Sequence, residues 1–78
     1  MSPNDLLTRL NQKPFRPFRA LLSNNDAIDV LQHRGCVIVG ATSAVMPLQY
    51  ADSESGWKIV VRWKTVLLDQ IVELIDLE

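Results

Sequence analysis

The stretch that decides the fold is KPFRPFR at residues 13–19, which repeats Pro-Phe-Arg and runs directly into alternating apolar residues. Each proline removes a backbone N–H and biases the residue before it toward extended geometry, so a helix cannot continue through this stretch. The chain must therefore leave any N-terminal helix before Pro14 and enter a strand at about Phe18. The pattern predicts architecture and indicates no chemistry.

Upstream of this stretch the sequence predicts a short helix over residues 3–10. Ser2 is a favourable N-cap, and Pro3 suits the first helical position. Leucines at positions 6, 7 and 10 recur at helical spacing and give the helix one apolar stripe. We expect Leu6 and Leu10 to cover one opening of a sheet.

Downstream the apolar residues recur every second position, which predicts strands separated by polar turns. The expected strands are residues 18–22, 27–31, 36–39, 44–48, 57–64 and 71–77. Pro47 indicates that the fourth of these has a missing or irregular partner on one side. Residues 66–77 fit a helical stripe as well as an alternation. We favour a helical turn over 65–70 followed by a strand, with a C-terminal helix as the alternative.

The segment 57–64 has the clearest alternation in the chain. Trp57, Ile59, Val61 and Trp63 alternate with mostly charged residues, which predicts a half-buried strand. One tryptophan is expected at a rim or an interface. The expected core of the β region is Phe15, Phe18, Ile28, Val30, Val37, Val39, Ile59 and Val61.

Length and composition favour a single small domain, residues 1–78, with a helix at about 3–10 and a β region at about 15–77. A chain of this size buries a modest share of its surface, and pairing with further copies would add to it, so we expect a homo-oligomer. Cys36 is the only cysteine, which excludes an internal disulfide and favours the cytoplasm. We expect no signal peptide and no membrane-spanning segment.

The net charge of −1 is unevenly distributed. Four bases and no acid lie in residues 9–19, and four acids and no base lie in residues 69–78. One interpretation is that the two ends of the chain pair, within a subunit or across an interface. The alternative is a basic surface for nucleic acid, which the near-neutral total charge makes weaker.

Few residues could carry chemistry. His33 and Cys36 have the spacing of a two-ligand metal arm, but the chain has no second Cys/His pair to complete a zinc site. A nucleophile beside His33 would lack a third, orienting group. The three glycines are widely spaced and form no phosphate-binding loop. We therefore expect no catalytic, cofactor-binding or metal-binding residues, and no enzyme.

Several segments together resemble a group of uncharacterised short bacterial proteins. These are the PFRPFR entry at 14–19, the turn at 24–26, Val30, His33, the strand at 37–39 and the closing IVELI at 71–75. Members of that group have a Pro-Phe-x-Pro-Phe-Arg entry, an Asp-Gly-type turn and a Val-x-His-Pro segment. In this chain the turn lacks the glycine, and Arg34 follows His33. The resemblance implies a short helix followed by a strongly bent sheet similar to a small barrel, and it brings no activity.

The expected fold is thus mainly β (α+β), with a short N-terminal helix and about five antiparallel strands in a strongly bent sheet or a small Sm-like barrel. The function that fits best is a non-catalytic interaction or assembly module that self-associates or binds a partner protein. The alternative is an Sm-like nucleic-acid-binding barrel that uses the basic stretch from Arg9 to Arg19. The candidate interaction residues are Arg16, Arg19, Trp57 and Trp63.

Overall fold

The computed structural model describes residues 1–32 and 36–77, which contain one short helix and six strands. The helix is α1, Pro3–Leu10, and the strands are β1 (Phe18–Leu22), β2 (Ala27–Val30), β3 (Ile38–Val39), β4 (Ser43–Asp52), β5 (Lys58–Leu67) and β6 (Ile71–Asp76). A single 3-10 turn, η1 (Leu68–Gln70), connects β5 to β6. The predicted class, mainly β with a short N-terminal helix, is confirmed.

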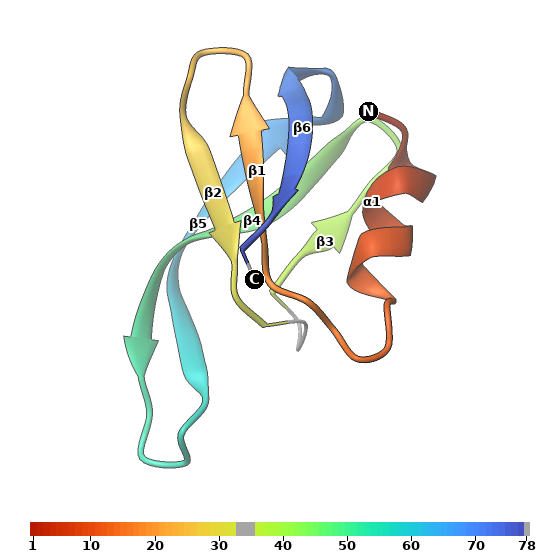
Figure 1. The fold of residues 1–78 in the computed structure, drawn as a ribbon. Coiled ribbons are helices and arrows are strands. Elements are labelled where there is room, and N and C mark those ends of the chain that lie inside the picture. Colours follow the sequence, from red (N-terminus) through yellow and green to blue (C-terminus); the bar gives the residue numbers. More distant parts are fainter. Residues whose placement is uncertain (33–35, 78) are drawn as a thin grey trace.

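The strands form two antiparallel three-stranded sheets, in the orders β2-β1-β6 and β3-β4-β5 (Figure 1). No strand pairing among the described residues joins one sheet to the other. The expected strongly bent sheet or small Sm-like barrel is therefore not confirmed.

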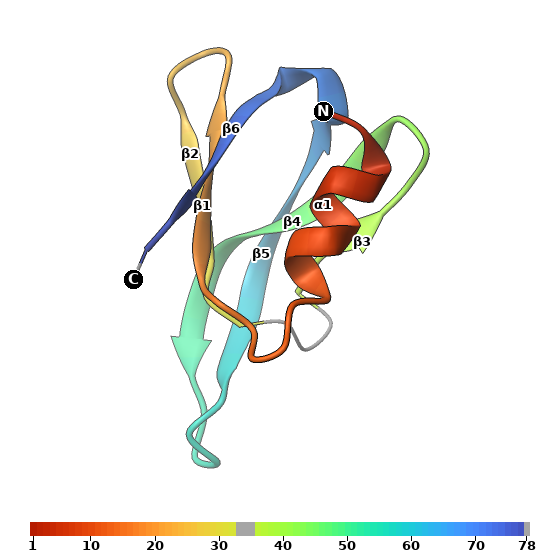
Figure 2. The ribbon, with the colours of Figure 1, turned by 45° about the vertical axis from the view of Figure 1, so that its right-hand side comes forward.

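The helix forms as the sequence predicts. The Ser2 hydroxyl accepts a hydrogen bond from the backbone N–H of Asp5 at 3.3 Å, which satisfies one of the donors left open at a helix start. Leu6 and Leu10 are buried against the sheets, whereas Leu7 is exposed. Figure 2 shows α1 beside β3, on the opposite side of the molecule from β2.

The proline-rich stretch leads into β1, which begins at Phe18 as expected and is the central strand of the first sheet. The turn after β1 uses asparagine where a glycine would be usual. Asn25 adopts a positive φ of 70°, and the side chain of Asn24 accepts a hydrogen bond from the backbone N–H of Asp26 at 3.0 Å. Asparagine tolerates this left-handed conformation, so the turn forms without glycine.

Tyr50 on β4 connects the two sheets. Its hydroxyl donates to the carbonyl of Asp29 at 2.8 Å and accepts from the backbone N–H of Leu31 at 3.2 Å. Burial raises the pKa of Tyr50, so the hydroxyl keeps its proton at neutral pH. One side chain thus ties the end of β2 to β4 without a ladder of backbone hydrogen bonds.

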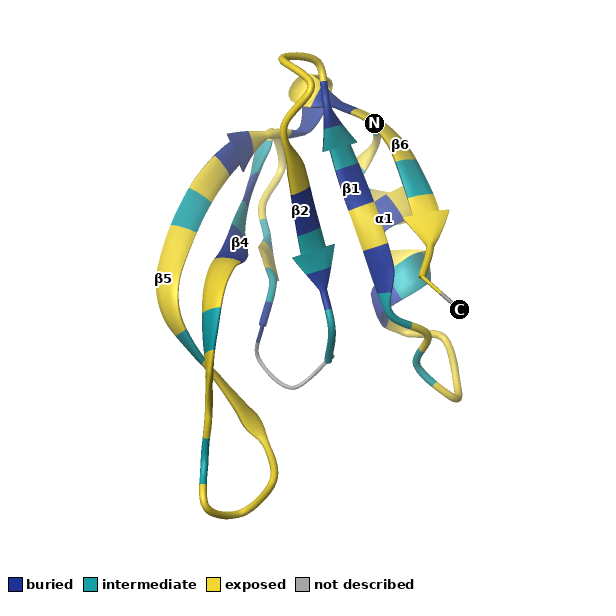
Figure 3. Cartoon of the chain, turned by 60° about the vertical axis from the view of Figure 1, so that its left-hand side comes forward, coloured by how far each residue is buried: buried dark blue, intermediate teal, exposed yellow. Residues whose placement is uncertain are grey.

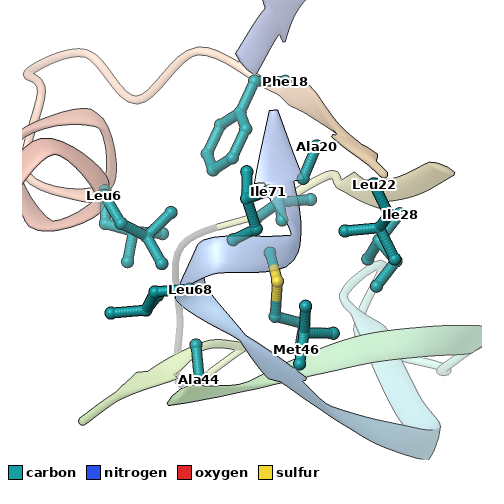
Figure 4. Packing of buried hydrophobic residues seen from close by; sticks show 12 residues of the cluster. Leu6, Phe18, Ala20, Leu22, Ile28, Ala44, Met46, Leu68 and Ile71 are labelled. Atoms are coloured by element: carbon teal, nitrogen blue, oxygen red, sulfur yellow. The ribbon is translucent and has the colours of Figure 1, made fainter. Parts of the chain in front are cut away.

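The core lies between α1 and the inner faces of both sheets (Figure 4). Its buried residues are Leu6, Leu10, Phe18, Ala20, Leu22, Ile28, Val30, Ala44, Met46, Val66, Leu68 and Ile71. Of the predicted β-region core, Phe18, Ile28 and Val30 are buried. The others that face this core, Phe15, Val37 and Val39, are partly buried against it.

The prediction that Ile59 and Val61 belong to the core is wrong. Their side chains are 53% and 50% exposed, and the residue of β5 that enters the core is Val66. Figure 1 shows the tip of the hairpin of β4 and β5 extending beyond the end of β2. Irregular pairing between Pro47 and Tyr50 also interrupts the alternation along the hairpin.

The ends of other elements differ from the prediction in ways that follow from strand pairing. Strand β4 continues to Asp52, because β5 pairs with it along its whole length. Residues 65–67 are strand and not helical turn, since they pair with residues 43–45. The final segment is a strand, so the alternative of a C-terminal helix is wrong. The irregularity expected at Pro47 is confirmed.

Candidate interaction surface

A row of large apolar side chains lies exposed along the outer half of β5 and at the residue before it. We call Trp57, Ile59, Val61 and Trp63 the β5 row; their exposed fractions run from 45% to 53%. Figure 3 shows β5 exposed along most of its length. Exposed apolar residues scattered singly are ordinary, but a contiguous row on one strand is typical of a surface that contacts another molecule.

The charged residues of β5 are all basic. Lys58 bonds to Asp52 across the hairpin at 2.9 Å, and this ion pair lowers the pKa of Asp52. The ammonium nitrogen of Lys64 lies 3.9 Å from a carboxylate oxygen of Asp26. Arg62 is exposed and makes no salt bridge with another described residue. The strand therefore presents positive charge beside its apolar row.

One edge of β5 has no strand partner in the described part of the chain, since β5 is the outer strand of its sheet. Two glutamine side chains bind the ends of β5. Gln32 accepts from the backbone N–H of Lys58 at 3.2 Å and donates to the carbonyl of the same residue. Gln70 accepts from the backbone N–H of Leu67 at 3.3 Å. Between these two positions, residues 59–66 keep an open strand edge.

Strand β6 is the outer strand of the other sheet and carries the opposite charge. It pairs with β1 on one side, and Val72 on β6 is 66% exposed. Its charged residues, Glu73 and Asp76, are both acidic. Glu73 is exposed and makes no salt bridge within the described residues. This second open edge is acidic where β5 is basic.

Asp76 is held by an arginine of the helix. A guanidinium nitrogen of Arg9 lies 2.5 Å from a carboxylate oxygen of Asp76, and the guanidinium carbon lies 5.0 Å from the centre of the Phe18 ring. The Arg9 side chain is only 19% exposed. One base of the N-terminal stretch thus pairs with one acid of the C-terminal stretch.

The structure places the four candidate residues in two regions. Arg16 is exposed between α1 and β1, and Arg19 lies on β1 in the first sheet. The Arg19 guanidinium donates two hydrogen bonds to the carboxylate oxygens of Asp29, at 2.7 and 3.2 Å, and this bidentate contact raises the pKa of Arg19. Trp57 and Trp63 belong to the hairpin of the second sheet. The arginines therefore belong to one sheet and its approach, and the tryptophans to the other.

The strand favoured over residues 71–77 is confirmed as β6, but the sequence pattern missed its place at the edge of a sheet and the contacts of the glutamines. Exposed Val72 and Ile75 flank Glu73, but the ambiguity between helix and strand hid the edge that they form. Gln32 and Lys58 are 26 positions apart, so no local signal could indicate their contact.

The residues considered for metal or nucleophilic chemistry do not form a described site. His33 lies outside the described residues, so the proposed metal arm has no described geometry. Cys36 is buried, and burial raises the pKa of its thiol, which disfavours the reactive thiolate. Within residues 1–32 and 36–77, no three His, Cys, Asp or Glu side chains gather as metal ligands would.

Two surface hollows, about 370 and 270 Å³, lie along residues 10–16, where Lys13 and Arg16 supply the charged groups.

Comparison with known proteins adds no relative. No family model matches the chain, and neither the curated proteins nor the solved structures contain a match. In the part of the chain that the structure describes, no helix is long and apolar enough to cross a membrane.

Proposed function

We propose that this protein is a non-catalytic interaction and assembly module that self-associates or binds a partner protein through the β5 row. The observation that supports the proposal is a contiguous apolar row on a strand whose outer edge is open. A second strand laid along such an edge gains backbone hydrogen bonds and covers the exposed side chains together.

Covering this surface would supply part of the free energy that association requires. Fully burying a large aliphatic side chain contributes about 1.5–3 kcal/mol, so covering the exposed half of each member adds roughly 1 kcal/mol. Four half-exposed side chains therefore contribute several kcal/mol before the cost of association. The tryptophans are of the residue type most enriched at the centres of interfaces.

The alternative of nucleic-acid binding by residues 9–19 has less support. Two of the arginines in this stretch already form salt bridges, Arg9 with Asp76 and Arg19 with Asp29. Their pairing leaves less charge for phosphates, and the net charge of −1 adds no general attraction.

Two finer features accompany the proposal. The contact of Tyr50 with Asp29 and Leu31 supports a barrel-like arrangement in which the two sheets act as one strongly bent unit. The free, buried thiol of Cys36 supports a location in the cytoplasm, where cysteines stay reduced.

Sedimentation velocity from low to high micromolar concentration tests the proposal. We expect the wild type to sediment as more than one chain, and Ile59→Lys to shift it toward the monomer, because a charge would be buried in the contact. Leu7→Lys on α1 is the matched control, since Leu7 is also exposed (40%) but lies outside the row. A strict monomer at high micromolar concentration would contradict self-association.

Intrinsic fluorescence gives an independent readout, because both tryptophans of the chain belong to the β5 row. We expect the emission maximum to move to shorter wavelength as concentration rises, since association removes water from the indole rings. Emission that does not depend on concentration, in a sample that sediments as an oligomer, would place the contact elsewhere.

A further inference from the structure

We infer that copies of this chain pair head to tail, with the open edge of β5 in one copy against the open edge of β6 in the next. This inference rests on the proposed self-association and names the surfaces that carry it.

The topology leaves few edges available for such pairing. The outer strands of the two described sheets are β2, β6, β3 and β5. Strand β2 lies next to β4, to which Tyr50 ties it. Strand β3 contains only two residues, Ile38–Val39. The edges that are both long and open are those of β5 and β6.

Charge decides which of these edges meet. Strand β5 carries three bases and no acid, and Lys58 and Lys64 already pair with Asp52 and Asp26, which leaves Arg62. Strand β6 carries two acids and no base, and Asp76 already pairs with Arg9, which leaves Glu73. Pairing β5 with β5 would oppose bases, and pairing β6 with β6 would oppose acids, and like charges across strands are destabilising. Only β5 against β6 brings opposite charges together. Arg62 and Glu73 make no salt bridge with another described residue, so their charges are available for this contact.

The apolar surface follows the same division. Ile59, Val61 and Trp63 are exposed on β5, and Val72 and Ile75 are exposed on β6. Both sides of the contact therefore offer apolar area as well as backbone hydrogen-bonding groups. The edges of β5 and β6 differ and lie on different sheets. A copy that uses its β5 edge in one contact therefore still has its β6 edge open for another. Such a heterologous contact generates a closed ring or an open filament.

Two charge reversals test the pairing. We expect Arg62→Glu and Glu73→Arg, each alone, to raise the dissociation constant of the assembly by about tenfold, because each opposes like charges. An equimolar mixture of the two variants should assemble again with the variants alternating, since every contact between unlike variants joins opposite charges. The double variant should also assemble. Sedimentation velocity measures all four samples, and circular dichroism checks that each remains folded.

The controls make the same charge changes at exposed positions away from both edges. Lys13→Glu, in the loop after α1, matches the first reversal, and Glu54→Lys matches the second; we expect the assembly to be unchanged in both. If the controls weaken assembly as much as the edge variants, general repulsion explains the effect and the inference is wrong.

The outcomes separate this inference from the proposed function. If the wild type assembles and Glu73→Arg does not weaken the assembly, β6 is not part of the contact, which refutes the head-to-tail pairing and leaves self-association standing. Failure of both the mixture and the double variant to assemble refutes the pairing in the same way. A monomeric wild type refutes the proposed self-association itself.

Discussion

Replacing Tyr50 with phenylalanine removes the hydroxyl that joins the two sheets and leaves the ring in place. The hydroxyl makes two hydrogen bonds, to the carbonyl of Asp29 at 2.8 Å and from the N–H of Leu31 at 3.2 Å. Both bonds are partly buried, and both join β4 to the end of β2. The variant therefore tests whether a single side chain contributes strongly to the association of the two sheets.

The expected loss can be worked out from these contacts. A typical hydrogen bond contributes about 1 kcal/mol, and a buried group left without a partner costs about 1–3 kcal/mol. We expect Tyr50→Phe to lower the free energy of unfolding by about 1–3 kcal/mol. For a domain of this size, each kcal/mol corresponds to a fall in Tm of about 4–8 °C. Urea unfolding followed by circular dichroism measures the loss, and the m-value should stay unchanged.

The pH dependence gives a second test. Burial raises the pKa of Tyr50 in the folded state, so its protonated form is favoured there. The resulting stability is fully present below the unfolded pKa of about 10 and is lost as pH rises through the higher folded value. The wild type should lose stability more steeply than Tyr50→Phe above pH ~10. A change in unfolding free energy below about 0.5 kcal/mol at neutral pH, with parallel alkaline profiles, would refute the reasoning.

Three further predictions concern the core, the helix and the basic stretch. Val66→Ala, at a fully buried position, should lower the unfolding free energy by about 1–3 kcal/mol. Val72→Ala, at a position that is 66% exposed, should change it by less than about 0.5 kcal/mol. Equal effects of the two variants in urea titrations would contradict the assignment of the core. Arg9→Ala should cost about 1–2 kcal/mol of stability, because it removes both an ion pair and a contact over an aromatic ring; an unchanged Tm would argue against it. Filter binding to single-stranded RNA at physiological salt should show no complex; sub-micromolar, salt-sensitive binding that Arg16→Glu/Arg19→Glu abolishes would favour the nucleic-acid alternative.

Elements that depend on neighbours in sequence were predictable. The cap at Ser2 and the leucine spacing fix α1, and the prolines of residues 13–19 place the start of β1 at Phe18. The turn at Asn25 follows from the tolerance of asparagine for positive φ. In each case the signal and the structure that it determines lie within a few residues of each other.

The face of β5 that enters the core was not predictable from its alternation. A period of two separates two faces of a strand but does not say which face meets the rest of the chain. That choice depends on long-range pairing, which places Ala44 of β4 opposite Val66. The irregular pairing after Pro47 then interrupts the register along the rest of the hairpin. Neither effect has a local signal.

The candidate surface was predictable in part for a related reason. The sequence singled out Trp57 and Trp63 by their residue type, and both are about half exposed. Charge alone could not show that Arg19 is paired with Asp29, because the partners lie on different strands. The strand at residues 71–77 and its acidic charge were predictable, but its position as an outer strand depends on its pairing with β1.

The failed prediction for β5 is itself an argument about its surroundings. Alternation of apolar and charged residues is typical of a strand with one covered face, and the apolar residues of this strand are the ones left half exposed. Within the described residues, Tyr50 and the backbone of Lys58 contact the end of β2 and the residue after Leu31, whereas the side chains of the β5 row stay about half exposed. A pattern suited to burial and a position without intramolecular cover are reconciled if another molecule supplies the cover. The basic charge of β5 and the acidic charge of β6 then favour a second copy of this chain as that molecule.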